Sequence, residues 1–326
     1  MILKYLPSYI TPVYYTEETW LAERRKGMGG SDVAVVMGLN KYKSELRLYK
    51  EKVEGLAEDL SENVFIKKGK DLEDLIRLKY CTPYLDEKGY VLLHPDVILT
   101  NDNDPIFRAN LDGFAVPKYF VDNYEDNIVV EIKWVSEFGE SNWNGDEYYG
   151  VPANYYAQVQ EYMYVTGARK AIVCALFDSN WKVQFYEIPF NADFVCKMIE
   201  ETYRFMNNHV ACKIPPKLNA GLDKEFITEA VKTVSPTYEE PEMNEKIVLY
   251  KELKTNIATL TDAANGILSD LTEMYLKGGR PTSPLLRIKI SAVHSKRFDA
   301  KSFEEAHPDL YKQFIKESEY TRTTVC

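Results

Sequence analysis

The chain has 326 residues, 45% of them hydrophobic and 28% charged, and a formal net charge of -10 at pH 7. This length allows one large domain or a core with an appendage, and the apolar content suffices for a substantial core. No apolar run approaches the roughly 18 residues of a membrane span, and MILKYLPSYITPVYY does not resemble a signal peptide. The negative charge disfavours a passive DNA-binding module, because such a module neutralises phosphates with a basic face. It disfavours a metal-dependent enzyme less, since carboxylates that hold cations add to the negative count.

The cysteines are scattered along the chain without CxxC spacing, at Cys81, Cys174, Cys196, Cys212 and Cys326. Such a set fits a reduced, cytoplasmic protein and argues against a disulfide framework, a zinc site or an iron–sulfur cluster. The four histidines are equally dispersed. We therefore expect them to be surface or packing residues rather than metal ligands.

The N-terminal part of the chain is predicted to be mainly helical. EETWLAERR carries acidic residues that suit the first turn of a helix. GMGGSDVAVVMGLN then predicts a Gly-rich turn, a short apolar helix with Ser31 as its N-cap, and a stop at Gly38. Ser44 is expected to cap the next helix, ELRLYKEKV, which stops at Gly55. A further helix is predicted over residues 64–80.

From Gly89 onwards the pattern changes to short β-like runs separated by turn residues. YVLLH, DVILT, FRANLDGFAV and NIVVEIKWV are predicted to be strands of one sheet. VPANYYAQVQEYMYVTG is expected to be helical after its proline, AIVCALF and KVQFYEI to be two further strands, and residues 192–208 to be a helix. This order predicts an α/β fold with a central mixed sheet flanked by helices.

The composition changes at residues 209–240, where prolines and charged residues accumulate. We expect a first domain over residues 1–215, a linker or surface loop over 216–240, and a C-terminal region over 241–326. Apolar residues recur there at intervals of three and four from 247 to 274, which predicts a long helix with one apolar stripe. LLRIKISAV predicts a strand and AKSFEEAHPDLYKQFIKES a helical segment, so the region combines a helix with a small α/β piece.

Charged residues interrupt an otherwise apolar strand. Glu131 and Lys133 are two residues apart in VVEIKW, so their side chains lie on the same face of the sheet. Asp112, in ANLDG, is expected in a hairpin before this strand. Because burial of an unpaired charge is costly, these residues need a metal, a partner or water.

Phosphodiester hydrolysis is a chemistry that such a set supports. A hard divalent ion prefers carboxylate oxygens, backbone carbonyls and water. Asp112 and Glu131 would supply carboxylates, the Ile132 backbone carbonyl a third ligand, and Glu73 a fourth, directly or through water. The metal would activate water and stabilise charge on the phosphate, while Lys133 would orient that water or hold the phosphate. Spacing alone also allows an ordinary hairpin with a surface ion pair, because a D…ExK pattern occurs by chance in so charged a chain.

Several segments in combination resemble a known family. RKGMGGSDVAVVMGLNKYKSELRLYKEKVEG, GKDLE, ANLDG, VVEIKW and VPANYYAQVQEYMYVTGARKAIVCAL resemble, in this order, the YqaJ-like viral recombinase family, which includes lambda-type phage exonuclease. The resemblance covers residues 15–210. It implies a restriction-endonuclease-like PD-(D/E)XK core and processive 5′→3′ digestion of one strand of linear duplex DNA. The resulting 3′ single-stranded overhangs would serve homologous recombination by single-strand annealing.

The resemblance also implies a cofactor and partners. The metal is expected to be Mg²⁺, with Mn²⁺ able to substitute, and the partners to be duplex DNA ends and a single-strand annealing protein of the RecT/Red-beta type. A ring-shaped homo-oligomer, a trimer or a tetramer, is expected, in a phage- or prophage-encoded protein acting in the cytoplasm of a bacterial host. Residues 241–326 are expected to pack on the core, extend the subunit interface or dock the annealing protein.

Residue by residue, the resemblance assigns a catalytic set. Glu73 matches the helix acid, Asp112 and Glu131 match the metal carboxylates, and Lys133 matches the catalytic lysine. Gln158 matches the first glutamine of the AQVQ motif. The residues alone leave Gln158 open as a polar position on an amphipathic helix. Glu161, three residues later, is expected on the same helix face.

A second set is assigned to the 5′ phosphate. Arg24, Gly30 and Ser31 would hold this phosphate through a guanidinium, backbone N–H groups at a helix start and a hydroxyl. Arg25 competes with Arg24 for the role. Read without the family, GMGGSD is a loop before a capped helix.

Two other function classes stay open. One is an endonuclease of the same core, which cuts a closed circular duplex, as an exonuclease does not. The other is a catalytically silent DNA-binding recombination scaffold. Retention of the whole catalytic set argues against the scaffold, because a decayed site would be expected to lose some of its members.

Overall fold

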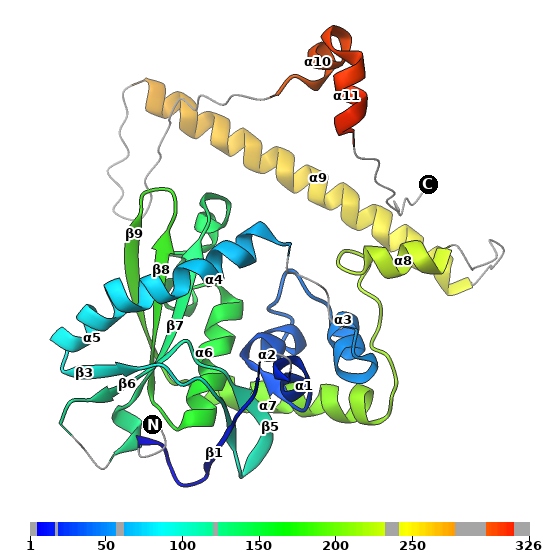
Figure 1. Ribbon diagram of the computed structural model, residues 1–326. Helices are drawn as coiled ribbons and strands as arrows, with labels where there is room; N and C mark the ends of the chain where they lie inside the picture. The colour runs from blue at the N-terminus through cyan, green and yellow to red at the C-terminus, as the bar shows by residue number, and fades with distance from the viewer. Residues whose placement is uncertain are drawn as a thin grey trace. The chain divides into compact units, whose positions relative to one another are not determined.

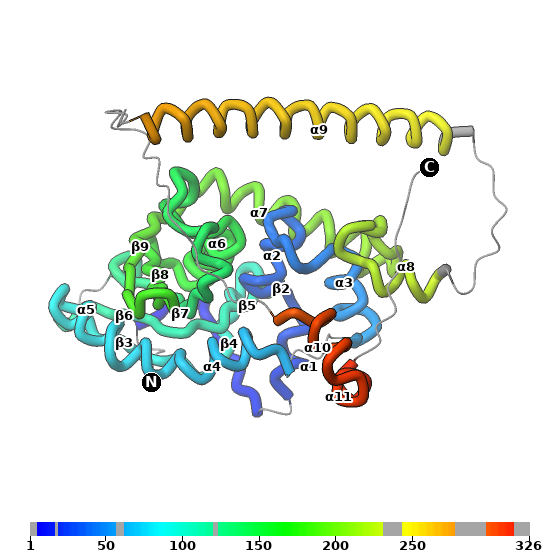
Figure 2. The backbone as a smooth tube through the Cα atoms, turned by 90° about the horizontal axis from the view of Figure 1, so that it is seen from above, coloured from blue at the N-terminus to red at the C-terminus, as the bar shows by residue number. Residues whose placement is uncertain are grey.

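The computed structural model describes residues 5–16, 19–56, 62–119, 123–231, 241–277 and 298–315. The chain divides into two compact units, Met1–Asp223 and Lys224–Cys326. Figure 1 labels most elements of both units, and Figure 2 adds β2 and β4. Each unit is described by itself.

Two mixed β-sheets form the frame of the first unit (Figure 1). The strands are β1 Ile10–Val13, β2 Met28–Gly29, β3 Tyr90–Leu93, β4 Ile98–Asn101, β5 Asp104–Ala109, β6 Gly113–Pro117, β7 Ile128–Val135, β8 Lys170–Phe177 and β9 Lys182–Pro189. One sheet has the order β1-β4-β5-β2 and the other β3-β6-β7-β8-β9. β2 pairs with β5, and β7 with β8, in parallel, whereas the other pairs are antiparallel.

Helices flank these sheets. They are α1 Trp20–Arg25, α2 Gly30–Val36, α3 Glu45–Tyr49, α4 Val64–Ile76, α5 Thr82–Glu87, α6 Ala153–Thr166 and α7 Ala192–Phe205. π-helical turns follow three of them, at Lys50–Glu54, Arg77–Cys81 and Met206–Ala211. Short 3₁₀ turns lie at Tyr124–Asp126, Glu137–Asn142 and Tyr148–Gly150. α2 packs against both α6 and α7 (Figure 2). The predicted α/β class, with mixed β-structure flanked by helices, is confirmed.

The prediction that four β-like runs belong to one sheet is wrong. β4 and β5 lie in the four-stranded sheet, whereas β3, β6 and β7 lie in the five-stranded sheet. The chain crosses from one sheet to the other between Ala109 and Gly113, so Asp112 lies in this crossing and not in a hairpin. Alternating apolar residues look alike in either sheet, and the sequence therefore does not indicate which sheet a strand joins.

β7 separates an apolar environment from a polar one. Ile128, Val130 and Ile132 pack in a core cluster with Ile76 and Leu85 from the α4–α5 side of the sheet. Glu131 and Lys133 project from the opposite face. The crossover from β7 to the parallel strand β8 runs through α6, which contacts β7 and β8. The sheet thus presents the two charged residues on the side where α6 lies.

Several predicted helix boundaries are confirmed. The side chain of Ser44 accepts a hydrogen bond from the Arg47 N–H at 3.1 Å and caps α3. Gly55 ends the π-helical turn after α3 with φ of 74°, and Gly167 ends α6 with φ of 78°. Both positions use the left-handed conformation that glycine adopts without a Cβ penalty.

The start of α2 differs from the prediction. Gly29 is the N-cap, and Ser31 lies inside the first turn. Asp32 closes the cap, because its Oδ2 accepts a hydrogen bond from the Gly29 N–H at 3.2 Å. An aspartate three residues after the cap performs the capping-box role. The Ser31 hydroxyl is therefore not used as a cap.

The second unit contains α8 Lys224–Val231, α9 Pro241–Leu276, α10 Ala300–Ala306 and α11 Pro308–Phe314. α8 lies within the segment expected to be a linker or surface loop, and α9 contains the predicted long helix. The expected helical segment near the C-terminus is two helices that meet at His307. The predicted strand LLRIKISAV lies outside the described residues. None of the helices in the described ranges combines the length and apolar character of a membrane span.

Candidate active site

A cavity of about 190 Å³ in the first unit brings together residues that lie far apart in the sequence. Its lining includes Arg24, Gly30, Ser31, Asp112, Glu131, Lys133 and Gln158. A larger groove of about 1500 Å³ shares Arg24, Ser31, Asp112 and Lys133 with the cavity. Glu73 and Ile132 line this groove. The structure thus places the catalytic and phosphate-binding sets predicted from the sequence in this cavity and in the groove that shares part of its lining.

Glu131 is a fully buried carboxyl group. Its Oε1 accepts a hydrogen bond from the Lys133 ammonium, whereas its Oε2 has no partner among the described residues. Burial and the negative charge of Asp112 raise the pKa of Glu131 to about 8, against the opposing effect of Lys133. A buried carboxylate oxygen without a donor requires a cation or a proton.

Asp112 is fixed at the edge of β7. Its Oδ2 accepts a hydrogen bond from the Ile132 N–H at 2.8 Å. β6 pairs with β7 only as far as Val130, so the Asp112 carboxylate takes the place of a strand partner beyond that point. The N–H and C=O groups of one strand residue point to the same edge. The Ile132 carbonyl therefore opens toward the side on which Asp112 lies.

Lys133 remains a cation in this site. Burial alone would lower the pKa of Lys133, but the carboxylates of Glu131 and Asp112 raise that pKa above its usual value. The ammonium group also lies 5.0 Å from the centre of the Tyr155 ring, a favourable cation–π arrangement. A lysine held in its charged form can stabilise negative charge or orient water, but it is not a general base.

Arg77 connects Glu73 to Asp112. Its Nη2 donates to Glu73 Oε1 at 2.6 Å, and its Nε donates to the Asp112 carbonyl at 3.0 Å. Burial and the charge of Asp112 raise the pKa of Glu73, whereas Arg77 lowers it. The sequence analysis missed Arg77, although its position four residues after Glu73 is the spacing of a helical ion pair.

Gln158 lies in the cavity, but Glu161 does not. The Gln158 Nε2 donates to the hydroxyl of Tyr162 at 2.9 Å, so these two residues present a connected polar surface. Glu161 is fully buried, and burial together with the charge of Asp32 raises the pKa of Glu161 well above its usual value. Gln158 packs against Gly30, and the charge of Asp32 acts on Glu161, so both residues lie near α2. Their shared helix face stays a prediction.

Gly30, in GMGGSD, permits a close approach of α2 to α6. A Cβ on Gly30 would lie 2.6 Å from Gln158 Cγ and 2.9 Å from Tyr162 Cε1. Distances this short do not occur between real carbon atoms, and the neighbours form part of the cavity wall. The absence of a side chain at Gly30 therefore allows Ser31 to lie close to Gln158 of α6.

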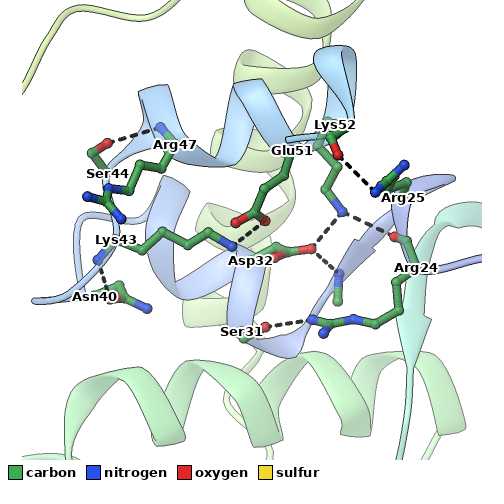
Figure 3. Close-up of polar contacts among 12 residues, drawn as sticks. Arg24, Arg25, Ser31, Asp32, Asn40, Lys43, Ser44, Arg47, Glu51 and Lys52 are labelled. Carbon is green, nitrogen blue, oxygen red and sulfur yellow. Dashed lines mark hydrogen bonds and ion pairs between the residues drawn. The ribbon is translucent and has the colours of Figure 1, made fainter. Parts of the chain in front are cut away.

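Arg24 and Arg25 point to different partners (Figure 3). The Arg24 Nη2 donates to the Ser31 hydroxyl at 3.0 Å, and both residues line the cavity. The Arg25 Nη2 donates to the Gly55 carbonyl at 3.0 Å, and Arg25 is absent from the cavity lining. The geometry thus favours Arg24 over its neighbour as a ligand-binding residue.

Lys52 holds the backbone of the same segment (Figure 3). Its Nζ donates to Asp32 Oδ2 at 2.7 Å, to the Arg24 carbonyl at 3.2 Å and to the Gly27 carbonyl. The side chains of Lys52 and Asp32 are only 5% and 4% exposed. Burial alone would raise the pKa of Asp32, but Lys52 and Arg24 hold that pKa well below its usual range. The sequence analysis missed Lys52, because a lysine in a helical pattern usually lies on a solvated face.

The donor set around β7 suits a hard divalent cation. Among the described residues, no group of three or more His, Cys, Asp or Glu side chains is placed to hold a metal ion. Burial and repulsion from the Asp112 carboxylate nevertheless raise the pKa of Glu131, and one Glu131 oxygen lacks a donor. Two carboxylates, a backbone carbonyl and water are the ligands that Mg²⁺ takes when it keeps part of its hydration shell. The residues fit a partly hydrated ion rather than a closed cage.

The fold and this cavity define an α/β protein with a carboxylate–lysine centre beside a cationic segment. Residues 19–169 match the family model described as the YqaJ-like viral recombinase domain. The matched residues are thus similar to the family that the sequence resemblance indicates, and they include every proposed catalytic residue.

Individual proteins are also similar to the chain. The uncharacterized protein YqaJ of Bacillus subtilis (strain 168) is 25% identical over 322 residues, which cover 94% of this chain and 93% of that protein. An alkaline exonuclease from Laribacter hongkongensis matches in structure with a TM-score of 0.47 and 18% identity, covering 67% of this chain and 100% of its own. A phage-related exonuclease from Haemophilus somnus 129PT matches with a TM-score of 0.42 and 14% identity, covering 57% and 94%.

Proposed function

We propose that this protein is a magnesium-dependent exonuclease with a PD-(D/E)XK core, which digests one strand of linear duplex DNA in the 5′→3′ direction. One observation carries the proposal. Glu131 is fully buried with an unpartnered oxygen, beside Asp112 and Lys133, in a cavity of the YqaJ-like domain. Burial of a carboxyl group with one oxygen lacking a donor is costly in free energy, and a bound metal ion would offset this cost.

Asp112, Glu131 and the Ile132 carbonyl are the proposed protein ligands of Mg²⁺, with Mn²⁺ able to substitute. Glu73 lines the adjoining groove and would contribute directly or through water. A bound divalent ion supplies an activated water and stabilises negative charge on a scissile phosphate. The hydrogen bond from the Ile132 N–H holds one Asp112 oxygen in place and orients the carboxylate.

Lys133 and Gln158 complete the proposed catalytic set. Lys133 is held as a cation, so it can hold the scissile phosphate or orient the attacking water. Gln158, hydrogen bonded to Tyr162, offers a neutral polar group in the same cavity. Because neither residue is placed to accept a proton at neutral pH, both act through position and charge.

The 5′-phosphate set is Arg24, Gly30 and Ser31. Arg24 and Ser31 are hydrogen bonded to each other at the cavity wall, and the backbone of Gly30 begins α2. A guanidinium, a hydroxyl and N–H groups of a helix start are together a suitable anion site. Preference for 5′-phosphorylated ends is the expected consequence.

The finer features follow from the family resemblance. We propose that digestion leaves 3′ single-stranded overhangs for a single-strand annealing protein of the RecT/Red-beta type. A ring-shaped homo-oligomer would keep the enzyme on its DNA. The proposed setting is the cytoplasm of a bacterial host of the phage or prophage that encodes the protein.

Digestion of two DNA forms tests the proposal. Linear 5′-phosphorylated duplex and a covalently closed circle are incubated with the protein and magnesium, with a chelator as control. We expect loss of the linear duplex alone, accumulation of single strands and no reaction with the chelator. Cutting of the circle would assign the site to an endonuclease. Binding without cutting of either DNA would leave a recombination scaffold.

A further inference from the structure

Arg108 is a cation in the cavity wall whose guanidinium is incompletely satisfied. Its Nε and Nη1 are buried and donate no hydrogen bond to any residue in the described part of the chain. The residue lies on β5, where its Cα is in parallel register with that of Gly29 on β2. Buried donors without acceptors are costly in free energy, and guanidinium groups stay charged. The Arg108 side chain also lines the cavity, so an anionic ligand bound there would offset a charge that the protein leaves without a partner.

The surroundings of Arg108 belong to the segment that carries Arg24 and Ser31. A Cβ on Gly27 would lie 2.7 Å from Arg108 Nε, so the guanidinium packs directly on the backbone between those two residues. Arg108 also lines the same cavity as they do. The fold thus brings a second guanidinium to the backbone that already positions Arg24.

The carboxylates nearby do not neutralise Arg108. Burial lowers the pKa of Arg108, and the charge of Glu23 opposes this effect. Glu23, however, forms an ion pair with Lys26. No described residue forms an ion pair with the Arg108 side chain. The cavity therefore has positive charge to spare on the side of the GMGGSD segment.

We propose that Arg108 is a further specificity-determining residue, which binds the terminal 5′ phosphate of the DNA strand together with Arg24. The proposal rests on the function proposed above. A terminal phosphate monoester carries a charge of about -1.5 to -2 and three strong acceptor oxygens, whereas an internal phosphodiester carries a single charge. The guanidinium groups of Arg24 and Arg108 would bind the terminal phosphate. Lys133 and the proposed metal ligands would act on the internal phosphodiester. Arg108 thus favours phosphorylated over hydroxyl ends.

The rate ratio between phosphorylated and hydroxyl ends tests this role. Wild-type protein is expected to digest 5′-phosphorylated linear duplex faster than the same duplex with 5′-hydroxyl ends. In Arg108→Met the ratio is expected to fall by roughly 10- to 100-fold, the size of lost hydrogen bonds to a charged group. Arg169→Met is the matched control, because Arg169 forms an exposed ion pair with Glu125 and does not line the cavity. A purely structural defect would lower both rates and leave their ratio unchanged.

Thermal unfolding with inorganic phosphate gives a readout independent of activity. In the presence of a chelator, phosphate is expected to raise the unfolding midpoint of the wild type and of Arg169→Met, but to raise that of Arg108→Met much less. Arg108→Lys retains the charge without the planar fork and is expected to be intermediate. If Arg108→Met does not fold, the same measurements are made on Arg108→Lys instead.

The outcomes separate the inference from the function on which it rests. If the wild type digests no DNA but is stabilised by phosphate, and Arg108→Met is not, the proposed exonuclease would be contradicted. A phosphate site at Arg108 would still be supported. An active wild type whose end preference and phosphate stabilisation both persist in Arg108→Met would overturn the role of Arg108 and leave the exonuclease intact. If the wild type is active and Arg108→Met loses both the end preference and the phosphate stabilisation, the exonuclease and the role of Arg108 would both be supported.

Discussion

Glu131 and Lys133 show at the scale of single residues what a sequence pattern can and cannot reveal. Their spacing in an apolar strand is enough to place both on one sheet face, and the structure has them there, in contact. The hydrogen bond from the Ile132 N–H to Asp112 could not be predicted, because it depends on where β6 stops pairing with β7. The positions of Arg108 and Lys52 could not be predicted either, because only the fold brings these residues to the GMGGSD segment.

Gly30 offers a test of the packing between α2 and α6. Gly30→Ala is expected to destabilise the protein by about 1–3 kcal/mol, because the new methyl group overlaps Gln158 and Tyr162. Activity is expected to fall with it, since Gln158 must move. Gly69→Ala is the matched control: its Cβ meets nothing within 4 Å on α4, and it is expected to stabilise the fold by about 0.5–1 kcal/mol. Chemical denaturation measures both, and equal effects would contradict the packing account.

At the scale of elements, the segment from α1 to α2 is held by a buried ion pair rather than by its own secondary structure. Lys52, from the π-helical turn after α3, binds two carbonyls and a carboxylate of that segment. The helices here could be predicted from caps and apolar spacing, because those signals are local. The attachment could not be predicted, because it joins residues twenty or more positions apart. The division of the strands between two sheets was missed for the same physical reason.

Loss of Lys52 should therefore be much more costly than loss of an exposed lysine in the same region. Lys52→Met is expected to destabilise the protein by about 3–5 kcal/mol, because it leaves the Asp32 carboxylate buried and unpaired. Lys26→Met, which removes an exposed pair with Glu23, is expected to cost less than about 1 kcal/mol. Denaturant titration distinguishes the two, and a small effect of Lys52→Met would show that the segment is held by other contacts.

Asp32 gives this ion pair a dependence on pH. Its pKa in the folded protein lies below its usual value, so the pair contributes its stability at pH values above the unfolded pKa, which is about 3.9. The contribution is lost as the pH falls further, through the folded pKa. Asp32→Asn is expected to be less stable than the wild type at pH 7, with a difference that narrows below about pH 4. Unfolding free energies measured across this range check the sign, and a difference that widens in acid would contradict it.

At the scale of the whole molecule, an acidic chain concentrates cations at one depression. The net charge is -10, yet Arg24, Arg108 and Lys133 all line the cavity. The same lining holds Asp112 and Glu131. Cationic groups that can attract an anionic polymer therefore lie beside the carboxylates of the proposed metal site. The catalytic and phosphate-binding sets both lie in the unit Met1–Asp223, which agrees with an active site independent of the C-terminal region.

Truncation tests that independence. A fragment of residues 1–223 is expected to unfold cooperatively and to retain magnesium-dependent digestion, because every proposed site residue and the core cluster lie within it. Sedimentation of the fragment and of the full chain would show which part carries the proposed ring assembly. An unfolded fragment, or a folded one without activity, would show that residues 224–326 contribute to the site.

The most direct test of the central claim compares two glutamate variants on one substrate. Glu131→Gln and Glu187→Gln each remove one carboxylate from the same sheet. Glu131 lines the cavity, whereas Glu187, on β9, forms an exposed ion pair with Lys88. Digestion of linear 5′-phosphorylated duplex with magnesium is measured for both, with folding checked by thermal unfolding. We predict that Glu131→Gln lowers the rate by about 100-fold or more, as expected for loss of a preorganised electrostatic group, while Glu187→Gln digests at the wild-type rate. Full activity of folded Glu131→Gln would contradict the assignment of the site.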